Sequence, residues 1–172
     1  MSGTAFRKTG AAAMAAAAVM AVSVTLPAPA QAYVGKHNLK NYATGRCLDS
    51  NWDGAVYTLP CAPNGTNAHQ MWEPLLQYRD GVNPDIVVLR NDATGRCLAR
   101  INSTGELRTI VECDDNDSYA TVEWYAQGSS WKRVIFSHWY GNTSYAVDSN
   151  FTGGAYAQAW NGGLRQQWNF KS

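Results

Sequence analysis

Short apolar runs separated by polar turn residues fill most of the chain beyond about residue 33. Examples are residues 86–89, 107–111 and 134–136, which are rich in β-branched and aromatic side chains. Clusters of Gly, Asn, Asp and Ser bound these runs, and no window carries an apolar stripe with the 3.6-residue period of a helix. The pattern predicts an all-β protein of short strands joined by tight turns.

The first 32 residues follow a different pattern. Two basic residues at 7–8 precede an uncharged, Ala-rich run at 11–26, and the segment ends in the small-x-small sequence AQA at 30–32. This arrangement is typical of a secretory signal peptide, and it predicts cleavage after Ala32 and a secreted single domain at 33–172. The alternative is a membrane anchor, but the run is shorter than the ~20 apolar residues that a spanning helix needs. No membrane insertion is expected.

The remaining chain contains internal repeats. The sequence LKNYATGRCL at 39–48 is identical at eight of ten positions to LRNDATGRCL at 89–98, and SYAVDSN at 144–150 aligns with GRCLDSN at 45–51. Each copy closes with a similar tripeptide: QMW at 70–72, VEW at 122–124 and QQW at 166–168. The sequence therefore predicts three structural units, at about 39–80, 88–130 and 134–172. Their tryptophans, which recur with the repeat, are predicted to be core residues: Trp72, Trp124 and Trp168.

These motifs resemble the ricin B-type lectin family. The resemblance rests on Gly-x-Cys-Leu-Asp near the start of a repeat and Gln-x-Trp near its end, and it extends over about 39–170. It implies a β-trefoil of three repeats with pseudo-threefold symmetry. It also implies a non-catalytic protein without a cofactor, which binds a glycan or polysaccharide through shallow pockets.

The four cysteines fall into the first two repeats. Cys47 and Cys61 are 14 residues apart, Cys97 and Cys113 are 16 apart, and the third repeat has Ala146 at the first cysteine position and no second cysteine. Of the three possible connectivities, this joint loss favours disulfides within a repeat, Cys47–Cys61 and Cys97–Cys113. A zinc site is disfavoured because the sequence has no Cys-x-x-Cys pair and no phased histidine, so no metal is expected.

Sugar binding requires hydroxyl acceptors and an aromatic face for the C–H groups of the sugar. The resemblance implies an Asp after Cys-Leu, an aromatic residue before the second Cys, and an Asn-Gln pair leading into Gln-x-Trp. In the first repeat, the matching residues are Asp49, His69 at the usual Asn position, and Gln70. Leu59 occupies the aromatic position, and Tyr57, two residues earlier on the same strand face, is the candidate substitute.

The third repeat matches the implied pattern best. Its candidates for carbohydrate binding are Asp148, Gln158, Trp160, Asn161 and Gln166. Arg165 stands at the usual Asn position. The second repeat has Ala99, Val111 and Val122 at the three positions, so we expect it to have only a structural role.

Each candidate also has a simpler interpretation. Gln70 and Gln166 are equally suited to satisfying buried backbone groups, and Asp49 and Asp148 to forming turns through their own backbone.

The near-neutral charge of the chain argues against a nucleic-acid partner. With 14 Lys and Arg against 13 Asp and Glu, the chain lacks the positive charge expected of a nucleic-acid binder. The repeats do not account for four aromatic residues, namely Trp52, Trp131, Trp139 and Tyr140. Aromatic residues of this kind suggest an alternative function: the protein would be the interaction or targeting subunit of a secreted multi-protein complex, such as a toxin.

Overall fold

A computed structural model describes residues 35–63, 65–114 and 119–170. The predicted signal peptide and its cleavage site lie outside these residues. The described part is all-β, as predicted, with fourteen strands and two short 3-10 helices. The elements are β1 (His37–Asn38), β2 (Lys40–Asn41), β3 (Arg46–Ser50), β4 (Val56–Pro60), η1 (Ala68–Gln70), β5 (Met71–Tyr78), β6 (Asp85–Asn91), β7 (Cys97–Ile101), β8 (Leu107–Ile110), β9 (Ala120–Thr121), β10 (Glu123–Ser130), β11 (Arg133–Tyr140), β12 (Thr143–Ser149), β13 (Ala155–Ala159), η2 (Leu164–Gln166) and β14 (Trp168–Asn169).

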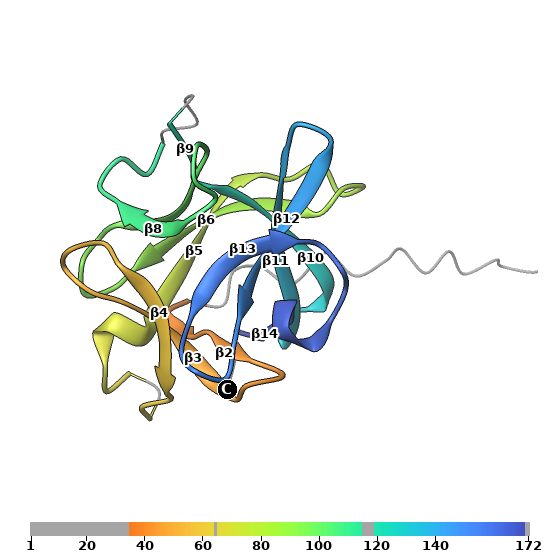
Figure 1. Ribbon diagram of the computed structural model, residues 1–172. Coiled ribbons are helices and arrows are strands. Elements are labelled where there is room, and N and C mark those ends of the chain that lie inside the picture. Colours follow the sequence, from red (N-terminus) through yellow and green to blue (C-terminus); the bar gives the residue numbers. More distant parts are fainter. Residues whose placement is uncertain (1–34, 64, 115–118, 171–172) are drawn as a thin grey trace, which may run out of the picture.

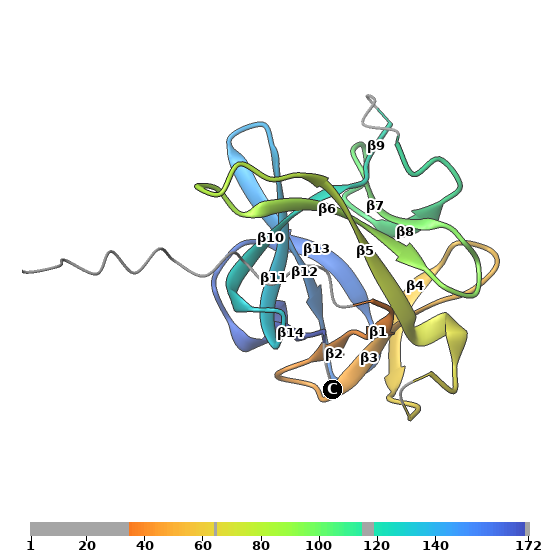
Figure 2. The ribbon, with the colours of Figure 1, turned by 180° about the vertical axis from the view of Figure 1, so that it is seen from behind.

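The strands form one antiparallel sheet that curls into a half-barrel (Figure 1, Figure 2). The hydrogen-bonded path runs β1-β5-β6-β10-β11-β14-β2-β3-β4, while β7 with β8 and β9, and β12 with β13, branch from it. Because β14 pairs with β2, the end of the described chain lies beside its beginning.

Three short hairpins project from this sheet and carry the repeated sequence segments. They are β3–β4, β7–β8 and β12–β13, and all three pair antiparallel. Neighbouring hairpins touch: the Thr58 amide donates to the Gly153 carbonyl at 2.7 Å, and the Thr109 amide donates to the Gly54 carbonyl at 2.9 Å. The hairpins are therefore held against one another by backbone contacts.

The three repeated tryptophans are core residues, as predicted, and all are fully buried. Each indole N–H donates to a backbone carbonyl of a hairpin strand, at 3.0 Å from Trp72, 3.0 Å from Trp124 and 2.9 Å from Trp168. The accepting carbonyls belong to Leu48, Leu98 and Val147. Each tryptophan thus fixes the residue just before position 49, 99 or 148, which is Asp in the first and third repeats and Ala in the second.

Both predicted disulfides are present. Cys47–Cys61 and Cys97–Cys113 have Cα–Cα distances of 4.9 and 5.3 Å. Each closes a short loop, and a loop of this length is worth about 3 kcal/mol in the chain-entropy treatment. The first disulfide ties β3 to the residue that follows β4, so it limits the opening of that hairpin.

A buried polar cluster joins the second and third hairpin regions. The guanidinium of Arg100 lies between the rings of Tyr140 and Tyr145, 4.7 and 4.4 Å from their centroids. His138 stacks on Tyr145 and packs edge-on against Trp124 with centroids 5.3 Å apart. Burial lowers the pKa of His138 to about 4, and the Arg100 charge acts in the same direction.

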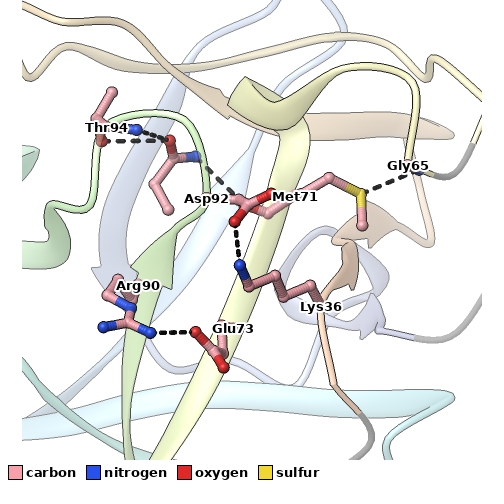
Figure 3. A network of polar contacts seen from close by, with 8 residues as sticks. Lys36, Gly65, Met71, Glu73, Arg90, Asp92 and Thr94 are labelled. Atoms are coloured by element: carbon pink, nitrogen blue, oxygen red, sulfur yellow. Dashed lines mark hydrogen bonds and ion pairs between the residues drawn. The ribbon is translucent and has the colours of Figure 1, made fainter.

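Ion pairs on the surface connect the start of the described chain to the β5–β6 hairpin (Figure 3). Lys36 pairs with Asp92, just after β6, and Glu73 on β5 pairs with Arg90 directly across on β6. Exposed pairs of this kind contribute little to stability. Lys36–Asp92 links the residue before β1 to the residue after β6, and Glu73–Arg90 lies within the β5–β6 hairpin.

No helix among the described residues is long and apolar enough to cross a membrane.

Candidate functional site

A depression opens beside the β12–β13 hairpin, with Asp148 in its wall. Asp148 lies near the end of β12, and the antiparallel register places Tyr156 of β13 directly opposite it. The depression has a volume of about 590 Å³. Its lining consists of Ala43, Asp148, Phe151, Tyr156, Gln158, Asn161, Gly163, Leu164 and Arg165.

The Asp148 carboxylate is buried without full compensation. The residue is 4% exposed, and its Oδ1 has no hydrogen-bond partner among the described residues. Burial raises the pKa of Asp148, while hydrogen bonds from Gln166 and Tyr156 oppose that rise. Burial and the nearby carboxylate raise the pKa of Tyr156 in turn. Oδ1 is buried and unpaired, which is costly for a charged group, and only the small exposed part of Asp148 meets the depression.

Gln166 is a buried residue that hydrogen-bonds the backbone around the depression. It is fully buried and absent from the lining of the depression. Its Nε2 donates to the Ala159 carbonyl at 3.0 Å, and its Oε1 accepts from the Asn161 amide at 2.9 Å. Most contacts of Gln166 thus satisfy backbone groups, which is the simpler interpretation of this residue. Because it also hydrogen-bonds Asp148, it positions the carboxylate.

The β3–β4 hairpin repeats this arrangement around Asp49. Asp49 is 2% exposed, and Tyr57 lies directly opposite it. Burial raises the pKa of Asp49, against hydrogen bonds from Tyr57 and Gln70. Gln70 again clamps the chain, donating to the Pro60 carbonyl at 3.2 Å and accepting from the Ala62 amide at 2.8 Å. The candidate substitute Tyr57 therefore lies against the carboxylate.

Each site also has an aromatic residue three positions after its Asp. Trp52 meets the ring of His69 edge-on, with centroids 5.9 Å apart, and the Arg165 guanidinium lies 5.4 Å from the Phe151 centroid. His69 Nδ1 also lies 2.6 Å from the Ser50 carbonyl oxygen.

Two of these side chains, Phe151 and Tyr156, were missed by the sequence reasoning. Extending the alignment of the first and third repeats places them at the positions of Trp52 and Tyr57. This extended alignment is the sequence signal that could have identified both residues.

Trp160, the aromatic residue expected beside Asp148, lies outside the depression, and its role in sugar binding stays a prediction. Trp160 is 48% exposed and does not line the depression, whereas Tyr156 does. The backbone amide of Trp160 donates to the Ser144 carbonyl at 2.8 Å. Ser144 lies four residues before Asp148 on β12, which is about 13 Å along an extended strand. Gln158 and Asn161, also expected, do line the depression.

The β7–β8 hairpin has no counterpart of these sites. Ala99 lies where the other hairpins have Asp, and Arg108 lies opposite it where they have Tyr. Val122 replaces the clamping Gln and belongs to an apolar cluster with Ala99, Ala120 and Val88. Apolar packing thus occupies the volume that the carboxylate and amide fill elsewhere.

Among the described residues, no cluster of three or more His, Cys, Asp or Glu side chains has the arrangement to hold a metal ion.

Comparison with known proteins yields a likeness of fold. No protein-family model matches the chain, and no curated protein sequence matches it. Among solved structures, the chain is similar to a GlcNAcα1-4Gal-releasing endo-β-galactosidase from Clostridium perfringens, with a TM-score of 0.60 and 21% identity. The match covers 80% of this chain but 32% of that enzyme. The chain therefore corresponds to about a third of a longer carbohydrate-active protein, and the likeness concerns fold alone.

Proposed function

We propose that this protein is a secreted, non-catalytic lectin that binds a glycan or polysaccharide at the third hairpin and at the first. The observation that carries the proposal is the buried Asp148 carboxylate, whose Oδ1 has no partner among the described residues and which lies in the wall of an open depression. A sugar hydroxyl that reaches the exposed part of this carboxylate would donate a hydrogen bond to it. Charge-assisted bonds of this kind are the strong ones in sugar recognition.

The rest of the lining suits the same ligand. Tyr156 and Phe151 offer apolar ring surface for sugar C–H groups, and Gln158 and Asn161 offer amides that both donate and accept. Each contact is worth only about 0.5–3 kcal/mol net, and association entropy opposes them. A single site should therefore bind a monosaccharide weakly.

The proposed fold is a β-trefoil of the ricin B type. Support comes from the three equivalent hairpins and from the three tryptophan N–H groups that reach the same carbonyl position in each. The likeness to a protein whose name describes release of a GlcNAc–Gal disaccharide supports a carbohydrate partner.

The proposal assigns binding and not hydrolysis. Glycoside hydrolysis commonly uses two carboxyl groups that flank the scissile bond. Asp148 is the carboxylate among the described residues that line the depression. Incubation with the bound oligosaccharide should therefore release no shorter product.

Secretion belongs to the same proposal. The two disulfides support it, because such bonds persist in oxidising compartments. Sequencing the N-terminus of the exported protein tests it, with Tyr33 as the expected first residue.

A second candidate function is attachment to a partner protein in a secreted complex. Trp139 and Tyr140, at the end of β11, are 60% and 46% exposed and lie outside the depression. Large exposed aromatic residues are typical of interaction surfaces.

A glycan array distinguishes the two candidates. The lectin proposal expects wild type to bind a restricted set of glycans, and the double variant Asp49→Ala/Asp148→Ala to bind none while retaining its melting transition. A folded wild type that binds no glycan would favour the partner-protein function.

A further inference from the structure

Arg165 gives the third-hairpin depression a feature that the first-hairpin site does not share. It lines the depression, and the corresponding residue of the first repeat is His69. A guanidinium is always charged and presents five N–H donors in a fixed plane. Arg165 lies at the position where the sugar-binding pattern implies a neutral amide, so the third site carries a permanent positive charge at its rim.

Arg165 contacts aromatic residues of the site, and its charge also acts on Asp148, whose pKa it lowers. Its guanidinium lies over the Phe151 ring at 5.4 Å and hydrogen-bonds the Tyr156 hydroxyl. In the described chain, Arg165 forms no ion pair with a carboxylate within 4.0 Å. Arg165 is exposed and lines the depression, so its guanidinium is accessible to a ligand there.

The two charges of the site lie at different depths. Asp148 is buried at 4% exposure, whereas Arg165 is exposed at the rim. A ligand anion paired with Arg165 would therefore not lie against Asp148, where like charges would repel. A ligand that fits presents a hydroxyl to Asp148 and an anionic group to Arg165.

We infer that the third-hairpin site selects saccharides that carry a carboxylate, as uronic acids and sialic acids do. The inference rests on the proposed sugar-binding function. A carboxylate matches the planar fork of an arginine with two parallel hydrogen bonds. The lining amides of Gln158 and Asn161 then contact the remaining hydroxyls. The preference is electrostatic in part, so it weakens as salt is added.

The experiment measures the third site alone. In an Asp49→Asn background, which silences the first site, titration calorimetry compares two matched pairs of ligands: oligogalacturonate against oligogalactose, and sialyllactose against lactose. Arg165→Gln removes the charge and keeps hydrogen-bonding groups. Lys132→Gln removes the same charge from an exposed residue outside the depression and is the matched control.

We expect at least one carboxylated ligand to bind about tenfold or more tightly than its neutral match. Arg165→Gln should abolish that preference while neutral binding persists, and Lys132→Gln should keep it. The pair that shows the preference identifies whether the acid is a uronate or a sialate. Equal binding within both pairs, or a preference that survives Arg165→Gln, would overturn the inference and leave the lectin proposal intact. Absence of binding to all four ligands by folded protein in the wild-type background would overturn both.

Discussion

At the scale of single residues, Asp148 shows how the proposed sugar site would cost stability. Its carboxylate is buried and only partly hydrogen-bonded, so its charged form is disfavoured and its pKa is raised. Because burial raises its pKa, this carboxylate contributes unfavourably to folding wherever the pH is high enough to ionise it. Function and stability are therefore opposed at this position.

The first prediction follows from that opposition. Asp148→Asn keeps the side-chain shape but removes the charge, so it should raise the melting temperature at pH 7. The gain should shrink as pH falls through the raised pKa of Asp148, because the wild-type carboxyl then becomes neutral too. Sugar binding at the third hairpin should fall roughly ten- to hundredfold. Thermal melts at pH 7 and pH 4, with binding titrations, check both effects. A variant that melts lower at pH 7 would contradict the argument.

The second prediction concerns the aromatic face. Tyr156 lies opposite Asp148 and lines the depression, and Trp160 does not. Tyr156→Ala should therefore weaken binding several-fold, since an aromatic contact is worth about 0.5–1.5 kcal/mol beyond its area. Trp160→Ala should leave binding nearly unchanged, although Trp160 was the residue expected from sequence. Titration of both variants on one glycan compares them directly, and the reverse order of effects would contradict the structural assignment.

The difference between Tyr156 and Trp160 shows which part of the site a sequence could predict. The positions of Asp49 and Asp148, and the pairing of the cysteines, follow from repeat alignment, because alignment transfers positions along the chain. The partner of Asp148 depends on which residue lies across the strand pair. The β12–β13 register pairs Asp148 with Tyr156 just as the β3–β4 register pairs Asp49 with Tyr57. Tyr156 was therefore predictable from an extended alignment, whereas the position of Trp160 depends on the path of the chain after β13.

At the scale of elements, the hairpins are locked together where glycine allows close backbone approach. Gly54 has φ +81°, and a Cβ built on it would lie 2.6 Å from the Thr109 carbonyl oxygen. The same pair of residues makes the backbone hydrogen bond between the first and second hairpins. The all-β class was predictable from short apolar runs, but this contact joins residues 55 positions apart and leaves no periodic signal in the sequence.

The third prediction tests that contact with a matched pair of variants. Gly54→Ala combines an unfavourable φ with a backbone clash, and overpacking of this kind adds roughly 1–3 kcal/mol. Gly81→Ala has nearly the same φ, +78°, but open space around its Cβ. It should cost only about 1–2 kcal/mol. Urea unfolding of both variants isolates the clash as their difference. Equal losses would show that the first and second hairpins tolerate separation.

At the scale of the whole molecule, the cluster around His138 links the second and third hairpin regions and makes stability depend on pH. The folded protein keeps His138 neutral down to a pKa of about 4, whereas an unfolded histidine titrates near 6.5. The unfolded state therefore binds more protons between these values. The stability that depends on neutral His138 is fully present above pH 6.5 and is lost as pH falls toward 4.

The fourth prediction is that this loss amounts to roughly 3 kcal/mol between pH 6.5 and 4. Asp49 and Asp148 act in the opposite sense, because their pKa values are raised. The measurement is therefore a difference: urea unfolding of wild type and His138→Asn across that range. His138→Asn should lose stability less steeply on acidification. Parallel curves would exclude His138 as the source.

The last prediction concerns the spatial relation of the two sites. Each belongs to a separate hairpin, and the hairpins contact each other through the Tyr57–Gly154 bridge, so the sites are held in a fixed relation. On a polymeric glycan, binding at one site raises the effective concentration of sugar at the other, and avidity then exceeds either affinity by about 100-fold or more. Asp49→Asn and Asp148→Asn should each remove most of the binding to an immobilised polysaccharide. With a monovalent sugar, each should remove only one of two independent binding events. If each variant loses the same fraction of binding to immobilised polysaccharide as to monovalent sugar, the two sites cannot reach one glycan chain together. Each site would then contribute only its own weak affinity.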